Sequence, residues 1–161
     1  MTVFHGSNME IQKPSVSFSK NYLDFGKGFY VTSYQNQAER WAARKASRYG
    51  GIPTVNLYTL LDDLSQFKVL KFDNENEKCL DFVCGCRKGE ELNKDYDIII
   101  GNVADDDVFK TVDMYFRGLW DKERTIQELR YFKMNNQICI VNQEILPAVL
   151  NFEKSYLVEE T

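Results

Sequence analysis

The single histidine of the chain, His5, limits the catalytic chemistry that the sequence can support. A Ser/His/Asp or Cys/His site needs an imidazole as general base, so any such site here has to be built on His5. Taken alone, an isolated histidine in a strand is more often structural. The familiar catalytic patterns are also absent, because the sequence contains no P-loop, GxGxxG, HExxH or GxSxG motif.

The cysteines and acidic residues do not form a metal-binding pattern. Cys84 and Cys86 are separated by one residue, no pair has CxxC spacing, and the histidine is far away in sequence. We therefore expect no metal site and reduced thiols. The run from Asp105 to Asp107 cannot direct three side chains at one ion, and we expect it to stabilise the N-terminus of a helix. The cysteines are Cys79, Cys84, Cys86 and Cys139.

Three short segments together indicate a more specific site. The sequence HGS, residues 5–7, lies at the end of the expected first strand, and FGKGFY, residues 25–30, leads into another strand. Trp41 follows Tyr30 by eleven residues on the next expected helix. Near the C-terminus, NQICI, residues 136–140, opens a late strand.

In this combination the chain resembles the ADP-ribosyltransferases of the diphtheria-toxin and poly(ADP-ribose) polymerase branch. Those enzymes carry a His-Gly on the first strand, a Gly-x-Gly-x-Tyr strand with a second aromatic residue eleven positions later, and a Glu that opens a late strand. The segment FGKGFYVTSYQNQAERWA matches the central part without a gap, and NQICIVNQEILPAVLNF is similar to the polymerase ending. The resemblance covers about residues 3–152, and the HGS, DFGKGFY and NQIC signatures are most similar to a small bacterial family within this superfamily.

The resemblance implies that NAD is the substrate and assigns a role to each residue of the site. Nicotinamide in NAD is a flat cation, so Tyr30 and Trp41 are expected to hold it by stacking and cation–π attraction. Gly6, which has no side chain, lets its backbone N–H and C=O reach the carboxamide. His5 is expected to bond a ribose hydroxyl of the adenosine half, with Ser7 assisting nearby. For Trp41, the alternative is ordinary core packing.

Gln137 is the departure from the family pattern. Related enzymes place a Glu there to bond the nicotinamide ribose and stabilise the oxocarbenium-like transition state. A neutral amide can still bond that hydroxyl, but it supplies no charge and cannot act as a base. Its loss costs several powers of ten in rate unless another carboxylate replaces it, because each ~1.4 kcal/mol is tenfold. Glu128, just before the strand, and Glu144, just after it, are the candidates.

The function expected from this resemblance is NAD-dependent mono-ADP-ribosylation of a macromolecular acceptor, protein or nucleic acid, with release of nicotinamide. His5, Tyr30 and Gln137 are the expected catalytic residues. The resemblance also suggests a bacterial intracellular toxin whose partner is an antitoxin protein. Two alternatives stay open: an NAD or ADP-ribose-binding module that lost the catalytic charge, and an interaction protein with a vestigial pocket.

Length and composition are consistent with these expectations. The 161 residues suit one domain spanning 1–161, and 43% hydrophobic residues are enough to form a core. A net charge of −4 argues against a general nucleic-acid binder. No stretch approaches the length of a membrane span and no signal peptide is visible, so we expect a cytoplasmic location. The basic residues between Arg40 and Arg48 have roughly helical spacing, which is typical of a solvated face.

The expected elements form an α+β fold, in which strands and helices mix without regular βαβ alternation. The resemblance specifies this further as an ADP-ribosyltransferase-like split β-sandwich with flanking helices. Ser33 or Asn36 is expected to cap a helix that runs to about Tyr49 and stops at Gly50-Gly51. The residues expected on one side of it are Tyr34, Ala38, Trp41, Ala42 and Lys45. The other expected helices cover about 76–86, 108–119 and 125–132, and the expected strands are about 2–5, 29–32, 55–60, 68–72, 96–101, 137–141 and 151–158.

Overall fold

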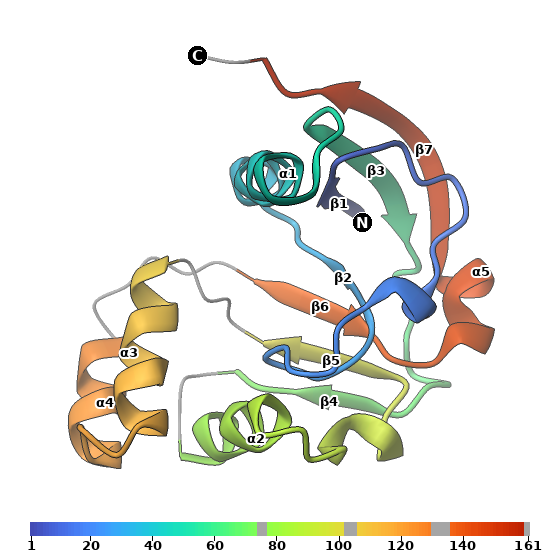
Figure 1. The fold of residues 1–161 in the computed structure, drawn as a ribbon. Coiled ribbons are helices and arrows are strands. Elements are labelled where there is room, and N and C mark those ends of the chain that lie inside the picture. The colour runs from blue at the N-terminus through green and yellow to red at the C-terminus, as the bar shows by residue number, and fades with distance from the viewer. Residues whose placement is uncertain (74–76, 102–105, 130–135, 160–161) are drawn as a thin grey trace.

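The computed structural model describes residues 1–73, 77–101, 106–129 and 136–159. Their strands form two sheets, one with β1, β3 and β7 and one with β2, β6, β5 and β4, which are labelled in Figure 1. The first sheet is antiparallel, in the order β1-β3-β7, and the second has the order β2-β6-β5-β4, with only β4 and β5 parallel. The strands are β1 (Thr2–Ser7), β2 (Phe29–Val31), β3 (Thr54–Leu60), β4 (Val69–Lys71), β5 (Ile98–Gly101), β6 (Gln137–Ile140) and β7 (Leu150–Leu157).

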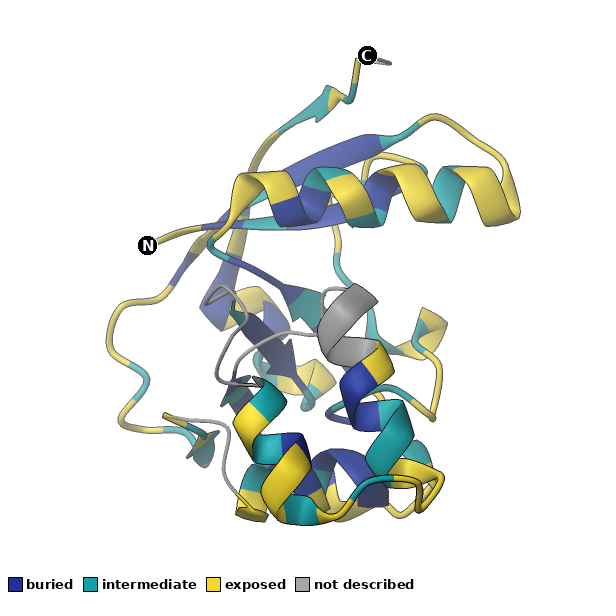
Figure 2. Ribbon diagram, turned by 90° about the vertical axis from the view of Figure 1, so that its left-hand side faces the viewer, coloured by how far each residue is buried: buried dark blue, intermediate teal, exposed yellow. Residues whose placement is uncertain are grey.

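The main core lies between the two sheets, because alternate residues of each strand point inward. Val3 of β1 and Tyr58 of β3 are fully buried there against Val31 of β2. The central strands β5 and β6 appear buried in Figure 2 as well. The buried residues of this core are Val3, Phe29, Val31, Tyr58, Leu60, Ile98, Ile138, Ile140, Leu146, Val149 and Leu150.

Helices cover the outer faces of both sheets. α1 (Gln35–Tyr49) packs Ala38 and Ala42 on the outer face of the first sheet, next to Val55. Its buried stripe faces the strands and its other side faces outward (Figure 2). α2 (Glu77–Arg87), α3 (Asp106–Phe116) and α4 (Lys122–Leu129) lie on the far side of the second sheet (Figure 1). The remaining helices are α5 (Leu146–Val149) and the short 3-10 helices η1 (Val16–Phe18), η2 (Leu92–Asp95) and η3 (Gln143–Ile145).

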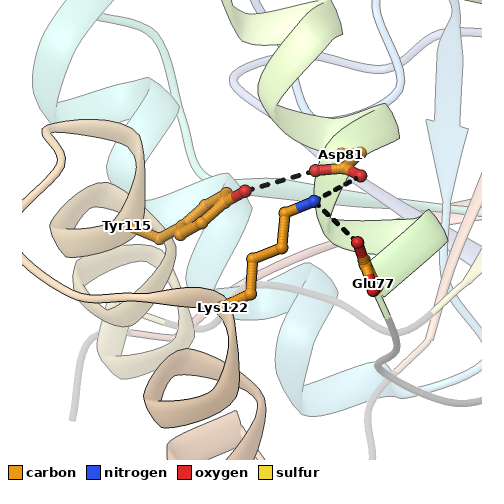
Figure 3. Close-up of polar contacts among 4 residues, drawn as sticks. All are labelled: Glu77, Asp81, Tyr115 and Lys122. Carbon is orange, nitrogen blue, oxygen red and sulfur yellow. Dashed lines mark hydrogen bonds and ion pairs between the residues drawn. The ribbon is translucent and has the colours of Figure 1, made fainter.

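Lys122 links the three helices beneath the second sheet (Figure 3). Its Nζ lies 2.8 Å from Glu77 Oε1 and 3.0 Å from Asp81 Oδ2, both on α2. Tyr115 of α3 donates its hydroxyl hydrogen to Asp81 Oδ1 at 3.2 Å. These two carboxylates raise the pKa of Lys122. The contacts are solvent-exposed, so they fix the relative position of the helices more than they stabilise the fold.

The α+β class expected from the sequence is confirmed, and each expected strand and helix has a counterpart. The capping expectation is wrong, because α1 begins after Tyr34 without a side-chain cap. The Ser33 hydroxyl instead accepts a hydrogen bond from Asn136 Nδ2 at 2.6 Å. At the other end, Gly50 terminates the helix as expected, with a φ of 79°. Within the described residues, no helix combines the length and apolar character needed to cross a membrane.

Candidate functional site at the junction of the two sheets

Among the described residues, one backbone bridge joins the two sheets, between Phe4 of β1 and Thr32, the residue after β2. Phe4 N–H donates to Thr32 O at 2.7 Å, and Thr32 N–H donates back to Phe4 O at 2.9 Å. In an antiparallel pair, the next such exchange falls two residues along each strand, between Gly6 and Tyr30. The strands have already separated at that point, because His5 Nδ1 lies 2.6 Å from Tyr30 O and occupies the carbonyl.

Because the His5 side chain, and not the Gly6 N–H, bonds the Tyr30 carbonyl, backbone polar groups of both strands are left without a partner across the junction. Phe4 directs its N–H and C=O away from β3, so the alternation of the strand directs those of Gly6 to the same edge. By the same alternation, Tyr30 N–H points from β2 toward β1. The junction therefore presents the N–H and C=O of Gly6 beside the N–H of Tyr30, which is the donor and acceptor pattern that an amide group can match.

Gly6 is also the point at which α1 approaches the strand most closely. A Cβ built on Gly6 would lie 2.0 Å from Ala38 O and 2.6 Å from Ala42 N, both in the helix backbone. The same Cβ would lie 2.8 Å from Trp41 Cβ, so the half-buried Trp41 side chain starts directly beside Gly6. Only glycine fits this position, and its presence brings an aromatic residue to the edge of the gap.

The hydrogen bonds of His5 define its protonation state. A carbonyl oxygen only accepts, so Nδ1 must carry the proton that is donated to Tyr30 O. Burial, together with the smaller effect of the Lys45 ammonium, lowers the pKa of His5 to about 3. The ring is consequently neutral, and Nε2 is a bare acceptor, 3.3 Å from Lys45 Nζ. The ring stacks on Phe29 with centroids 4.3 Å apart, which fixes its plane.

The side chain of Tyr30 points to the other face of the second sheet. Its ring packs partly buried beside Phe25 and Cys139, toward α2. Its hydroxyl donates to Gly26 O and accepts from Phe25 N–H at 3.2 Å. Gly26 has a φ of 74°, a conformation that glycine adopts without strain. Burial raises the pKa of Tyr30 well above its usual value, so the phenol stays neutral and its ring is held by the FGKG turn.

Gln137 is the first residue of β6 and is almost fully buried. It lies two residues before Cys139, which is opposite Tyr30, so Gln137 and Tyr30 share one face of the second sheet. The His5 ring lies between the sheets, on the other face. The structure thus joins His5 to the backbone of Tyr30, and in the described part of the chain no hydrogen bond joins Gln137 to either residue.

The candidate replacement carboxylates differ in position. Glu144 is exposed in η3, beyond the opposite end of β6 from Gln137. Glu128 is half-buried on α4. Asp106 and Asp107 open α3, but their side chains and all of Asp105 lie outside the described residues. Within the described ranges, no group of three or more His, Cys, Asp and Glu side chains could hold a metal ion. The four cysteines are free thiols.

Two residues that the sequence did not single out belong to this region. Asn136 joins the start of β6 to the end of β2, because its Oδ1 accepts from Thr32 Oγ1 at 3.0 Å and from Ser33 N–H at 2.8 Å. Asn136 is the first residue of the NQIC signature, immediately before the strand, and the sequence could have indicated it for that reason. Lys45 approaches His5 from α1. The sequence could have indicated it too, because it lies on the same side of the helix as Trp41. Ser7 is buried beside His5 and donates to Asn8 Oδ1 at 3.4 Å.

Comparison with known proteins places the chain in a family without assigning an activity. No curated protein matches it. A family model described as a protein of unknown function, DUF3990, matches residues 1–152, which includes every strand of both sheets except the end of β7. The chain therefore belongs to the DUF3990 family.

Proposed function

We propose that the junction of the two sheets binds NAD and that the protein transfers its ADP-ribose to a macromolecular acceptor. The feature that carries the proposal is the junction at Gly6, where the alternation of β1 directs the backbone N–H and C=O of Gly6 toward β2, beside Trp41. A carboxamide matches that edge, since it offers one acceptor and two donors in a plane. The sequence resemblance to ADP-ribosyltransferases, and the pairing of two sheets flanked by helices, support the same assignment.

The remaining groups of the junction suit the other parts of NAD. Trp41 provides an aromatic face for the cationic nicotinamide ring. The Tyr30 ring, held by its hydroxyl, is the expected second face, although in the ligand-free chain it packs toward α2. His5 offers Nε2 as an acceptor for a ribose hydroxyl, with its tautomer already set by Tyr30 O.

In the proposed reaction, the bond between the ribose C1′ and the nicotinamide nitrogen breaks. The electron pair of that bond leaves with nicotinamide, which departs as a neutral molecule. An acceptor nucleophile, on a protein side chain or a nucleobase, then forms the new bond to C1′ and loses its proton. Gln137 can accept a hydrogen bond from the ribose 2′-hydroxyl, but its amide provides no charge opposite the developing oxocarbenium ion. We therefore expect slow mono-ADP-ribosylation.

The neutral, buried Gln137 also favours a second candidate, a binding module that holds NAD or ADP-ribose without turnover. Titration calorimetry with NAD, followed by measurement of nicotinamide release over hours, separates the two. Binding with release supports the transferase, and binding without release supports the module.

The transferase proposal is tested further with labelled NAD and a cell lysate. We expect label to appear on protein or nucleic acid, and to be lost in His5→Ala and Trp41→Ala. Phe18→Ala is the matched control, because Phe18 is an aromatic residue with 91% of its surface exposed. If the native chain binds neither NAD nor ADP-ribose, both candidates are wrong.

A further inference from the structure

Lys45 is the one basic residue of the Arg40–Arg48 stretch that turns toward the junction. Arg40, Arg44 and Arg48 are exposed, as expected for a solvated helix face. Lys45 is instead partly buried, with its Nζ 3.3 Å from His5 Nε2. Its burial lowers the pKa of the ammonium. The basic stretch is therefore divided, and one of its cations lies in the candidate site.

Among the residues that the structure describes, no acidic side chain balances the charge of Lys45. In the described part of the chain, no carboxylate lies within ion-pair distance of its Nζ. Two groups act on it electrostatically: Tyr49 raises the pKa of the ammonium, and a second cation, Lys20, which donates to the Tyr49 hydroxyl, lowers it to a smaller extent. Removing an ammonium from water is costly unless an opposite charge compensates it. Two lysines near enough to repel each other favour an anion beside them.

The position of Lys45 on α1 relates this anion to the candidate NAD site. Trp41 and Lys45 are four residues apart, so they lie one above the other on the same side of the helix. Trp41 lies beside Gly6, where the carboxamide is proposed to bind, and Lys45 lies beside His5. In NAD the diphosphate lies between the two ribose units, and hence between groups bound at Gly6 and at His5.

We propose that Lys45, assisted by Lys20, binds the diphosphate of a dinucleotide such as NAD; this rests on the proposed function. His5 Nε2 has one lone pair, so it cannot accept from Lys45 and from a ribose hydroxyl at the same time. Binding therefore exchanges partners: the hydroxyl donates to His5, and the ammonium released from His5 pairs with the phosphate oxygens. In the absence of ligand, Lys45 keeps the acceptor of His5 satisfied.

The test is titration calorimetry with NAD, ADP-ribose, nicotinamide and inorganic pyrophosphate. For Lys45→Met we expect ADP-ribose affinity to fall roughly tenfold to a hundredfold, as for loss of a charged hydrogen bond, with nicotinamide affinity unchanged. Affinity of the native chain for ADP-ribose should fall with added salt, and less steeply in the variant. Arg40→Met is the matched control, since Arg40 is an exposed cation of the same helix.

Each outcome bears on a different claim. If native protein binds NAD but Lys45→Met and Arg40→Met have the same ADP-ribose affinity, the diphosphate site is wrong and the proposed function stands. If pyrophosphate binds in a Lys45-dependent manner but NAD does not bind, the anion site stands and the proposed function fails. Binding of neither ligand overturns both. Lys20→Met, on a residue outside the helices, gives the same comparison if Lys45→Met does not fold.

Discussion

The imidazole of His5 takes the backbone carbonyl of Tyr30 that would otherwise continue the pairing of β1 with β2. The Nδ1–O distance is 2.6 Å, and it follows directly after the Phe4–Thr32 pair that joins the two sheets. One side chain thus ends the backbone pairing between the sheets, fixes its own tautomer and leaves Gly6 without a partner on β2, while Gly6 stays paired with Val55 of β3. The structural and functional roles of this histidine are linked.

The stability of the fold should depend on pH through His5. Its pKa is about 3 in the folded chain and near 6.5 when unfolded, so the unfolded state binds the proton more readily between these values. Stability contributed by the neutral ring is complete above pH 6.5 and is lost as the pH falls toward 3. At pH 4 the loss is about 3 kcal/mol, since each pKa unit corresponds to about 1.4 kcal/mol.

Urea unfolding at pH 7 and at pH 4 measures this loss. His5→Gln is the control for the carboxylates, which still titrate in this variant. Between pH 7 and pH 4 its free energy of unfolding should fall by about 3 kcal/mol less than that of the native chain. Equal losses in the two proteins would show that His5 does not titrate as its burial requires.

Gly6→Ala should disturb both the fold and the site. The new Cβ meets the backbone of α1 at Ala38 O, and a helix backbone cannot move aside as a flexible side chain can. We expect a loss of about 1–3 kcal/mol or more, the range for overpacking, together with loss of NAD binding. Gly85→Ala is the control, because its nearest contacts are the side-chain ends of Leu92 and Glu90. Thermal unfolding should show a lower Tm for the first variant only.

Periodicity was sufficient to predict most elements of this fold. The alternation in β1 and β3 and the apolar run of β5 depend on burial, which the sequence records directly. The end of α1 was predictable for a similar reason, because Gly50 takes a φ that other residues rarely adopt. These are local properties of the chain.

The contacts across the junction could not be predicted in this way. The predicted cap of α1 was wrong because the Ser33 hydroxyl is hydrogen-bonded to Asn136, more than a hundred residues later in the chain. The spacing of Lys45 places it on the apolar side of the helix, whereas its charge favours the solvated basic face. Its contact with His5, a residue of another element, determines that it lies on the first. The face on which the Tyr30 ring lies likewise depends on its bond to Gly26 and on its partner Cys139.

The ring and the hydroxyl of Tyr30 should have separable effects. Tyr30→Phe removes the hydrogen bonds to Gly26 O and Phe25 N–H, at a cost of about 1–3 kcal/mol, but keeps an aromatic face. Tyr30→Ala also removes the packed ring and should cost about 3–5 kcal/mol. If the ring stacks on nicotinamide, the first variant keeps NAD affinity and the second loses it. Titration calorimetry with NAD, at a temperature below the lowest Tm of the three proteins, makes the comparison. If both variants bind NAD as tightly as the native chain does, the Tyr30 ring is not part of the NAD site.

Gln137→Glu should raise the rate at which nicotinamide is released. The change replaces a buried neutral amide by a carboxylate of similar size at the start of β6, where it can stabilise positive charge on the ribose. We expect a gain of about a hundredfold or more in NAD hydrolysis, the size of the effect of one oriented electrostatic group.

Gln143→Glu makes the same chemical change at an exposed residue of η3, beyond the opposite end of β6, and should leave the rate unaltered. Nicotinamide release is followed by chromatography, with NAD affinity measured in parallel to separate turnover from binding. A carboxylate at 137 that leaves NAD binding intact and release unchanged would mean that this position does not face the ribose, and that the protein acts as a binding module.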